Sequence, residues 1–115
     1  MKTKSKNSIG FGYAIKGIIH TVKNERNMRI HLSVALLVLI YSFLAKVNKQ
    51  DFILLLFAVF LVLVTEMINT AIEAAVDLCT EEQQPLAGIA KDVAAGAVLL
   101  AAINAVIIGL LVVIK

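Results

Sequence analysis

Three carboxylates and one carboxamide interrupt a strongly apolar stretch of the chain. They are Glu66, Asn69, Glu73 and Asp77. At about 100° per residue on a helix, the four positions fall within about 80° of one another and form one polar stripe. Each carboxylate in hydrocarbon would cost roughly 2.5–3.5 kcal/mol on insertion scales. We therefore interpret the stripe as functional.

The spacing within the stripe predicts a division of roles. Like charges four residues apart repel, so Glu73 and Asp77 need a cation, a proton or a basic partner. Carboxylates suit Mg²⁺, which binds through one or two of them together with substrate phosphates. Glu66 precedes Glu73 by about 10 Å along the helix axis, too far for both to hold one ion. We expect Glu73 to be a metal ligand, Glu66 a deeper general base, and Asn69 a hydrogen-bonding group between them.

A structural interpretation of these acids stays open, in which they pair across helices with Lys91, Arg26 or Arg29. Familiar soluble sites are absent from the sequence, which has no Gly-x-x-x-x-Gly-Lys-Ser/Thr phosphate loop. The two histidines lack metal-ligand spacing, and a lone cysteine cannot form an internal disulfide. A kinase built on this sequence would not have a soluble kinase fold.

The composition predicts an integral membrane protein. The chain has 115 residues, of which 60% are hydrophobic and 17% charged, whereas globular domains are roughly 45–50% apolar. We expect a single all-α domain over residues 1–115, with no nucleic-acid partner. Its predicted parts are a basic tail (1–7), an amphipathic surface helix (8–28) and three transmembrane helices (29–46, 51–78 and 86–114).

Charge asymmetry predicts the orientation. Seven of the eleven basic residues precede residue 30, so the positive-inside rule places the N-terminus in the cytoplasm. With three spans, the loop after the second span, and with it Glu73, Asp77, Lys91 and Asp92, also reaches the cytoplasmic surface. Small residues every four positions in the third span favour close helix packing in a homo-oligomer. They are Ala97, Ala101, Ala105 and Gly109.

The ordered motif Glu66-x-x-Asn69-Thr-Ala-Ile-Glu73-Ala-Ala-Val-Asp77, followed by Ala90-Lys91-Asp92, resembles the prokaryotic diacylglycerol kinase family. The resemblance begins at Tyr13-x-x-Lys16-Gly17 and continues through the third span. It implies a homotrimeric lipid kinase of the bacterial cell membrane, with active sites between protomers at the cytoplasmic surface. ATP would be the phosphoryl donor, Mg²⁺ the cofactor and a lipid alcohol the acceptor.

The resemblance also implies residue roles. Glu66 would be the general base, while Glu25 and Glu73 would hold divalent ions. Asn69 and Lys91 would contact phosphates, with Asp92 supporting Lys91. The other residues implied around the nucleotide are Tyr13, Lys16, Asp77, Glu82 and Gly88. Lys6 and Gln84-Pro85 depart from the family pattern near the adenine.

The resemblance also bears on the acceptor. Met67-Ile-Asn69-Thr70 and Lys91-Asp92-Val-Ala-Ala-Gly96 are most similar to the Gram-positive branch, which is largely undecaprenol kinase. The resemblance therefore implies undecaprenol as the acceptor, with diacylglycerol as the alternative. A small oligomeric transporter or pore is an alternative of another class. It is less favoured because the acids cluster at one surface and the first span holds none.

Overall fold

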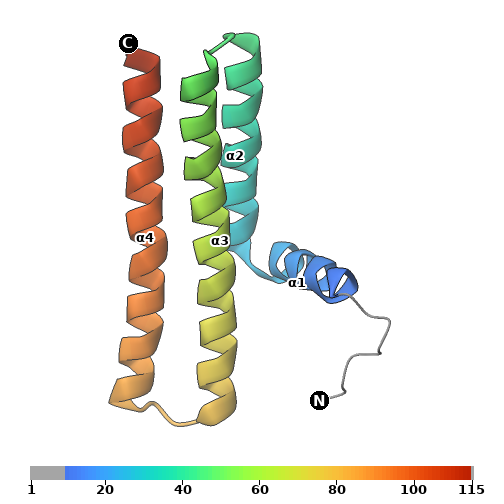
Figure 1. The fold of residues 1–115 in the computed structure, drawn as a ribbon. Helices are drawn as coiled ribbons and strands as arrows, with labels where there is room; N and C mark the ends of the chain where they lie inside the picture. Colours follow the sequence, from blue (N-terminus) through green and yellow to red (C-terminus); the bar gives the residue numbers. More distant parts are fainter. Residues whose placement is uncertain (1–9, 115) are drawn as a thin grey trace.

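The computed structural model describes residues 10–114 and forms four helices there. They are α1 (Phe11–Asn24), α2 (Arg26–Leu44), α3 (Lys49–Cys79) and α4 (Pro85–Ile114). The three longer helices run side by side, whereas α1 projects sideways from the beginning of α2 (Figure 1). By length and composition, α2, α3 and α4 can each cross a membrane, which confirms the predicted all-helical membrane fold. The predicted basic tail lies outside the described residues.

The helix expected over residues 8–28 divides at Glu25. The backbone of Glu25 is extended (φ −114°, ψ 112°), so α1 ends at Asn24 and α2 begins at Arg26. The last carbonyl groups of a helix have no partner within it. Here Nη1 of Arg29 donates to the carbonyl oxygens of Val22 and Lys23, each at 2.9 Å. These two hydrogen bonds stabilise the end of α1 and fix the turn toward α2.

The central helix, α3, packs against both α2 and α4. Its start is capped by Asn48, whose side chain accepts a hydrogen bond from the backbone N–H of Asp51 at 2.8 Å. Its 31 residues correspond to about 46 Å, which exceeds a hydrocarbon core of about 30 Å. The loop ends of α3 and α4 extend beyond the level at which α1 leaves the bundle (Figure 1).

The core is a narrow seam along α3. Leu55, Ala58 and Val62 are buried on α3, and Ala94 and Ala101 on α4. Ala101 belongs to the small-residue stripe predicted for oligomer packing, yet it is 4% exposed because α4 turns this position toward its own protomer.

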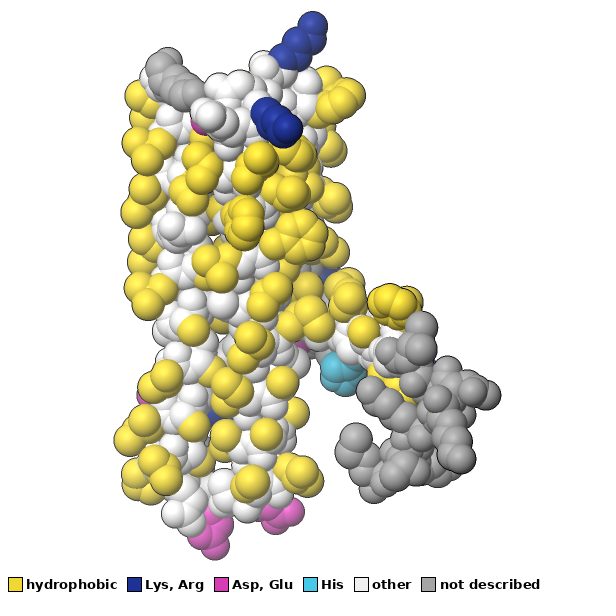
Figure 2. Space-filling view, in the orientation of Figure 1, with side chains coloured by type: hydrophobic (Ala, Val, Ile, Leu, Met, Phe, Trp, Pro, Cys, Tyr) yellow, Lys and Arg dark blue, Asp and Glu magenta, His cyan; other side chains and the backbone are white. Residues whose placement is uncertain are grey.

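The outer surface of the long helices is apolar. Yellow side chains cover most of the visible face, while acidic side chains gather at the end where α3 meets α4 (Figure 2). Apolar residues of α1 are also exposed, namely Phe11, Ile15, Ile18 and Ile19. A surface of this kind is suited to lipid rather than water. The chain is a membrane protein.

Candidate active site

Four residues of the predicted site meet in one hollow of about 500 Å³. We call it the acid hollow; it lies where the α1–α2 junction faces α3. Glu66, Asn69 and Glu73 come from α3, and Glu25 comes from the break between α1 and α2. The remaining lining residues are Asn24, Arg26, Asn27 and Ala95. The fold thus brings Glu25 to the polar stripe from a distant part of the sequence.

Glu66 is the most deeply placed of these acids. It is 2% exposed, and its Oε2 lies 3.9 Å from Nε2 of His31 on α2. That distance is longer than a hydrogen bond. The carboxylate therefore keeps acceptor capacity for a substrate hydroxyl, as a general base requires.

Thr70 ties Glu25 to α3. Its hydroxyl lies 3.3 Å from Oε1 of Glu25 and 3.1 Å from the backbone oxygen of Glu66. One hydroxyl proton serves one of these acceptors fully at a time. The contact draws the Glu25 carboxylate toward the stripe and leaves its second oxygen available.

The acid hollow fits a divalent cation that is shared with a substrate. No cluster of three or more His, Cys, Asp or Glu within residues 10–114 has the geometry of a metal site. Mg²⁺, however, takes one or two carboxylates and completes its shell with water and phosphate oxygens. Glu25 and Glu73 supply such carboxylates. The buried Oδ1 of Asn69 has no hydrogen-bond partner, and a cation or its bound water would satisfy it.

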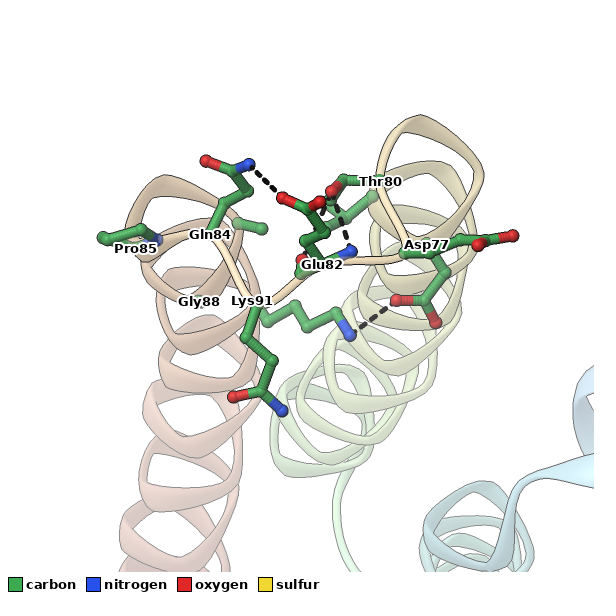
Figure 3. Close-up of a pocket in the computed structure, with 11 residues that line it drawn as sticks. Asp77, Thr80, Glu82, Gln84, Pro85, Gly88 and Lys91 are labelled. Carbon is green, nitrogen blue, oxygen red and sulfur yellow. Dashed lines mark hydrogen bonds and ion pairs between the residues drawn. The ribbon is translucent and has the colours of Figure 1, made fainter.

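A second hollow, of about 550 Å³, lies at the loop between α3 and α4. We call it the loop hollow (Figure 3). Lys91 reaches across it from α4, and its Nζ lies 2.6 Å from Oδ1 of Asp77 on α3. The backbone N–H of Glu82 donates to Oγ1 of Thr80 at 3.1 Å, which holds the loop over the hollow. The predicted residue Gly88 lines the hollow as well.

The two hollows follow one another along α3 and α4. Glu73 lines the acid hollow and Asp77, one turn later, the loop hollow. On α4, Ala95 lines the acid hollow, and Lys91, four residues earlier, lines the loop hollow. One helical turn is about 5.4 Å, so an extended anionic molecule the length of a nucleoside triphosphate can contact both hollows at once.

Comparison with known proteins decides the family. The family model described as prokaryotic diacylglycerol kinase matches residues 12–113. The chain belongs to this family. Undecaprenol kinase of Bacillus subtilis is 41% identical over 102 residues, which cover 89% of this chain and 83% of that protein.

Two further relatives are named diacylglycerol kinases. The protein of a Synechocystis species is 41% identical over 102 residues, covering 88% of this chain and 58% of the relative. The protein of Escherichia coli strain K12 is 38% identical over 96 residues, covering 84% and 79%. The chain is accordingly a membrane lipid kinase, and ATP use follows from the kinase family.

Three predicted nucleotide contacts lie away from both hollows in this diacylglycerol kinase family member. Tyr13 and Lys16 are exposed on α1, where Nζ of Lys16 lies 5.9 Å from the centre of the Tyr13 ring. Asp92 is exposed on α4, about 100° around the helix from Lys91. Lys91 instead pairs with Asp77. Within one protomer, the structure does not bring these three residues to the acids.

Two residues that contact the acids of the site were not predicted from the sequence. His31 approaches Glu66, and Thr70 contacts Glu25. A helix-spacing signal existed for Thr70, which lies one turn from Glu66 on the stripe's side of α3. No local signal existed for His31, because its contact depends on which face of α2 meets α3.

The pair of Lys91 and Asp77 gives a first prediction. Lys91→Gln and Asp77→Asn each remove the ion pair. The two side chains are 38% and 65% exposed, so the thermal unfolding temperature should be nearly unchanged in either variant. If Lys91 contacts phosphate, the KM for ATP should rise about tenfold in Lys91→Gln, which loses a charge-assisted hydrogen bond.

Asp77→Asn is the matched control for this prediction. It frees Lys91 without removing its charge, so the KM for ATP should rise by less than about fivefold. Kinetics and thermal unfolding of both variants in one detergent provide the measurement. Equal increases in KM would show that Lys91 acts only as the structural partner of Asp77.

Proposed function

We propose that this lipid kinase transfers the γ-phosphoryl group of ATP to undecaprenol. The observation that carries the proposal is the convergence of Glu25, Glu66 and Glu73 in one hollow beside a membrane-crossing helix. That arrangement suits a lipid alcohol that meets a water-soluble phosphoryl donor. Undecaprenol is favoured by the form of the motifs and by the similarity to the Bacillus protein. Diacylglycerol is the second candidate, because a diacylglycerol kinase is 41% identical too.

The proposed orientation places the N-terminus, both hollows and ATP on the cytoplasmic side of a bacterial cell membrane. In this arrangement α1 lies along the membrane surface with its exposed apolar residues toward lipid. The excess of basic residues before residue 30 supports it. The loop ends of α3 and α4, which extend past α1 (Figure 1), then stand in the aqueous phase where ATP is found.

The mechanism we propose is direct, in-line transfer. Glu66 accepts the proton of the lipid hydroxyl while the hydroxyl oxygen bonds to the γ-phosphorus. The bond between the γ-phosphorus and the oxygen that bridges it to the β-phosphate breaks in the same step. Glu25 and Glu73 would hold Mg²⁺, which supplies charge stabilisation to the phosphates when bound. Lys91 and Asn69 orient the phosphates, Asp77 positions Lys91, and Glu82 and Gly88 border the nucleotide in the loop hollow. Positioning and electrostatics provide most of the rate enhancement.

We also propose a homotrimer whose active sites lie between protomers. Tyr13, Lys16 and Asp92 do not line either hollow of their own chain, so the site of a neighbouring protomer is the simplest place for them to contact a nucleotide. The exposed apolar side chains of the long helices can contact both lipid and neighbouring protomers.

The acceptor assay tests the proposed function. Inverted membrane vesicles receive radiolabelled ATP and Mg²⁺ with undecaprenol or diacylglycerol at matched mole fractions. We expect faster labelling of undecaprenol, and a clear preference for diacylglycerol would establish the second candidate instead. Labelling in sealed right-side-out vesicles, where added ATP meets the outer face, would contradict the proposed orientation. Labelling of neither lipid would contradict the proposed acceptors.

The base assignment predicts a selective loss in Glu66→Gln. The amide keeps the size of the side chain but cannot take up the hydroxyl proton. We expect kcat to fall by roughly 10²–10⁴-fold, the usual contribution of a general base, while the Kd for ATP stays within about twofold. Substantial residual turnover would exclude Glu66 as the base. A large loss of ATP binding would assign it to the nucleotide site.

The oligomer prediction is checked by mixing two impaired variants. Purified Glu66→Gln and Lys16→Ala protomers are dissociated and reassembled together in one detergent, and activity is measured at an ATP concentration below the KM. If Lys16 of one protomer serves Glu66 of another, mixed trimers are more active than the sum of the two variants measured separately. Light scattering gives the mass of the complex. A monomeric mass, or a mixture no more active than that sum, would contradict a shared trimeric site.

A further inference from the structure

Transfer to an alcohol leaves a proton on the base, and this proton must depart before the next turnover. In this chain the base proposed for that step is Glu66, whose side chain is 3% exposed. Its open side faces the acid hollow, which the phosphates and the cation occupy in the proposed mechanism. A proton on Glu66 therefore has no direct contact with bulk water while products remain bound.

His31 approaches Glu66 from α2 and is not among the residues that line the acid hollow. Nε2 of His31 is 3.9 Å from Oε2 of Glu66. A change of about 1 Å in either side chain brings these atoms to hydrogen-bond distance. The His31 side chain is 23% exposed, against 3% for Glu66. His31 thus lies beside the buried acid and also reaches the surface of the protomer. It is five residues from the start of α2, about 7.5 Å along the helix from the level at which α1 would lie on the membrane surface.

Other charged groups that face this pair are poorly suited to carry a proton. The α1–α2 junction contributes Glu25 and Arg26 to the acid hollow, and α3 contributes Glu73. Arginine stays protonated in proteins, and the two glutamates are the proposed cation ligands. The described part of α4 contributes Ala95, which cannot titrate. Imidazole, in contrast, gains and loses a proton readily near neutral pH.

We propose that His31 is the proton exit of the active site, relaying to water the proton that Glu66 takes from the lipid hydroxyl. This inference rests on the proposed role of Glu66. Nε2 of the neutral imidazole accepts the proton from Oε2, and Nδ1 then releases one to solvent. This leaves the proton on Nε2, and exchange of the ring protons with water returns the ring to the tautomer that can accept again before the next turnover. The step moves one proton and no electrons. His31 is a positioning and relay residue that does not itself touch the substrate.

The relay predicts that His31 limits repeated turnover rather than the first transfer. In Glu66→Gln the first turnover itself should be slow. In His31→Gln and His31→Ala, rapid-quench measurements should show a first turnover within about twofold of wild type. Subsequent turnover should then be at least about tenfold slower, giving a burst of one product per site. His20→Gln is the matched control, because His20 is exposed on α1 and bonded to Asn24; it should behave as wild type.

Chemical rescue separates proton relay from a structural role. Imidazole added to His31→Ala should restore repeated turnover in proportion to its concentration. Pyrazole, a ring of the same shape but far weaker basicity, should not. Rescue by both rings, no rescue by either, or a first turnover as slow as later ones would overturn the proposal. Absence of lipid labelling by the wild-type protein would instead contradict the proposed function, so the two failures are distinguishable.

Discussion

The break between α1 and α2 is the constraint on which the candidate site depends. Glu25 is extended between the two helices, and Arg29 stabilises the end of α1 by donating to its last carbonyl groups. Had the helix continued through Glu25, the regular rotation of about 100° per residue would have set the direction of its side chain. The break instead directs the Glu25 carboxylate to Thr70 on α3. An acid supplied from a surface-exposed segment thereby joins acids supplied from a membrane-crossing helix.

The order of groups along α3 matches the order of atoms in the proposed reaction. Glu66 is buried within the bundle, Glu73 follows two turns later, and Asp77 with its partner Lys91 lies at the loop. In the proposed reaction, an alcohol confined to lipid would meet Glu66. The reacting phosphates would lie at Glu73, and the rest of the nucleotide at Asp77 and Lys91. Because one straight helix fixes these separations, an in-line arrangement needs no large movement of the chain.

Sequence reasoning succeeded where the information was local. Three apolar segments predicted three long helices, and helical spacing placed Glu66, Asn69 and Glu73 on one side of α3, where the structure finds them lining one hollow. The break at Glu25 was missed, because the hydrogen bonds that stabilise it come from the side chain of Arg29, which folds back onto α1. The approach of His31 to Glu66 was missed as well, since no pattern within α2 specifies which of its faces meets α3.

An ion pair explains one residue of the stripe but not the others. Asp77 has a close cationic partner in Lys91, so its presence needs no further explanation than an ion pair at an exposed surface. Glu66 is different. Its one described ion-pair contact is at 3.9 Å, which is too long to offset the cost of burying a carboxylate. Asn69 keeps a buried oxygen without a partner. A buried polar atom of this kind is rare in folded proteins. Beside a hollow that Glu66 also lines, it indicates a site that is completed by its substrates.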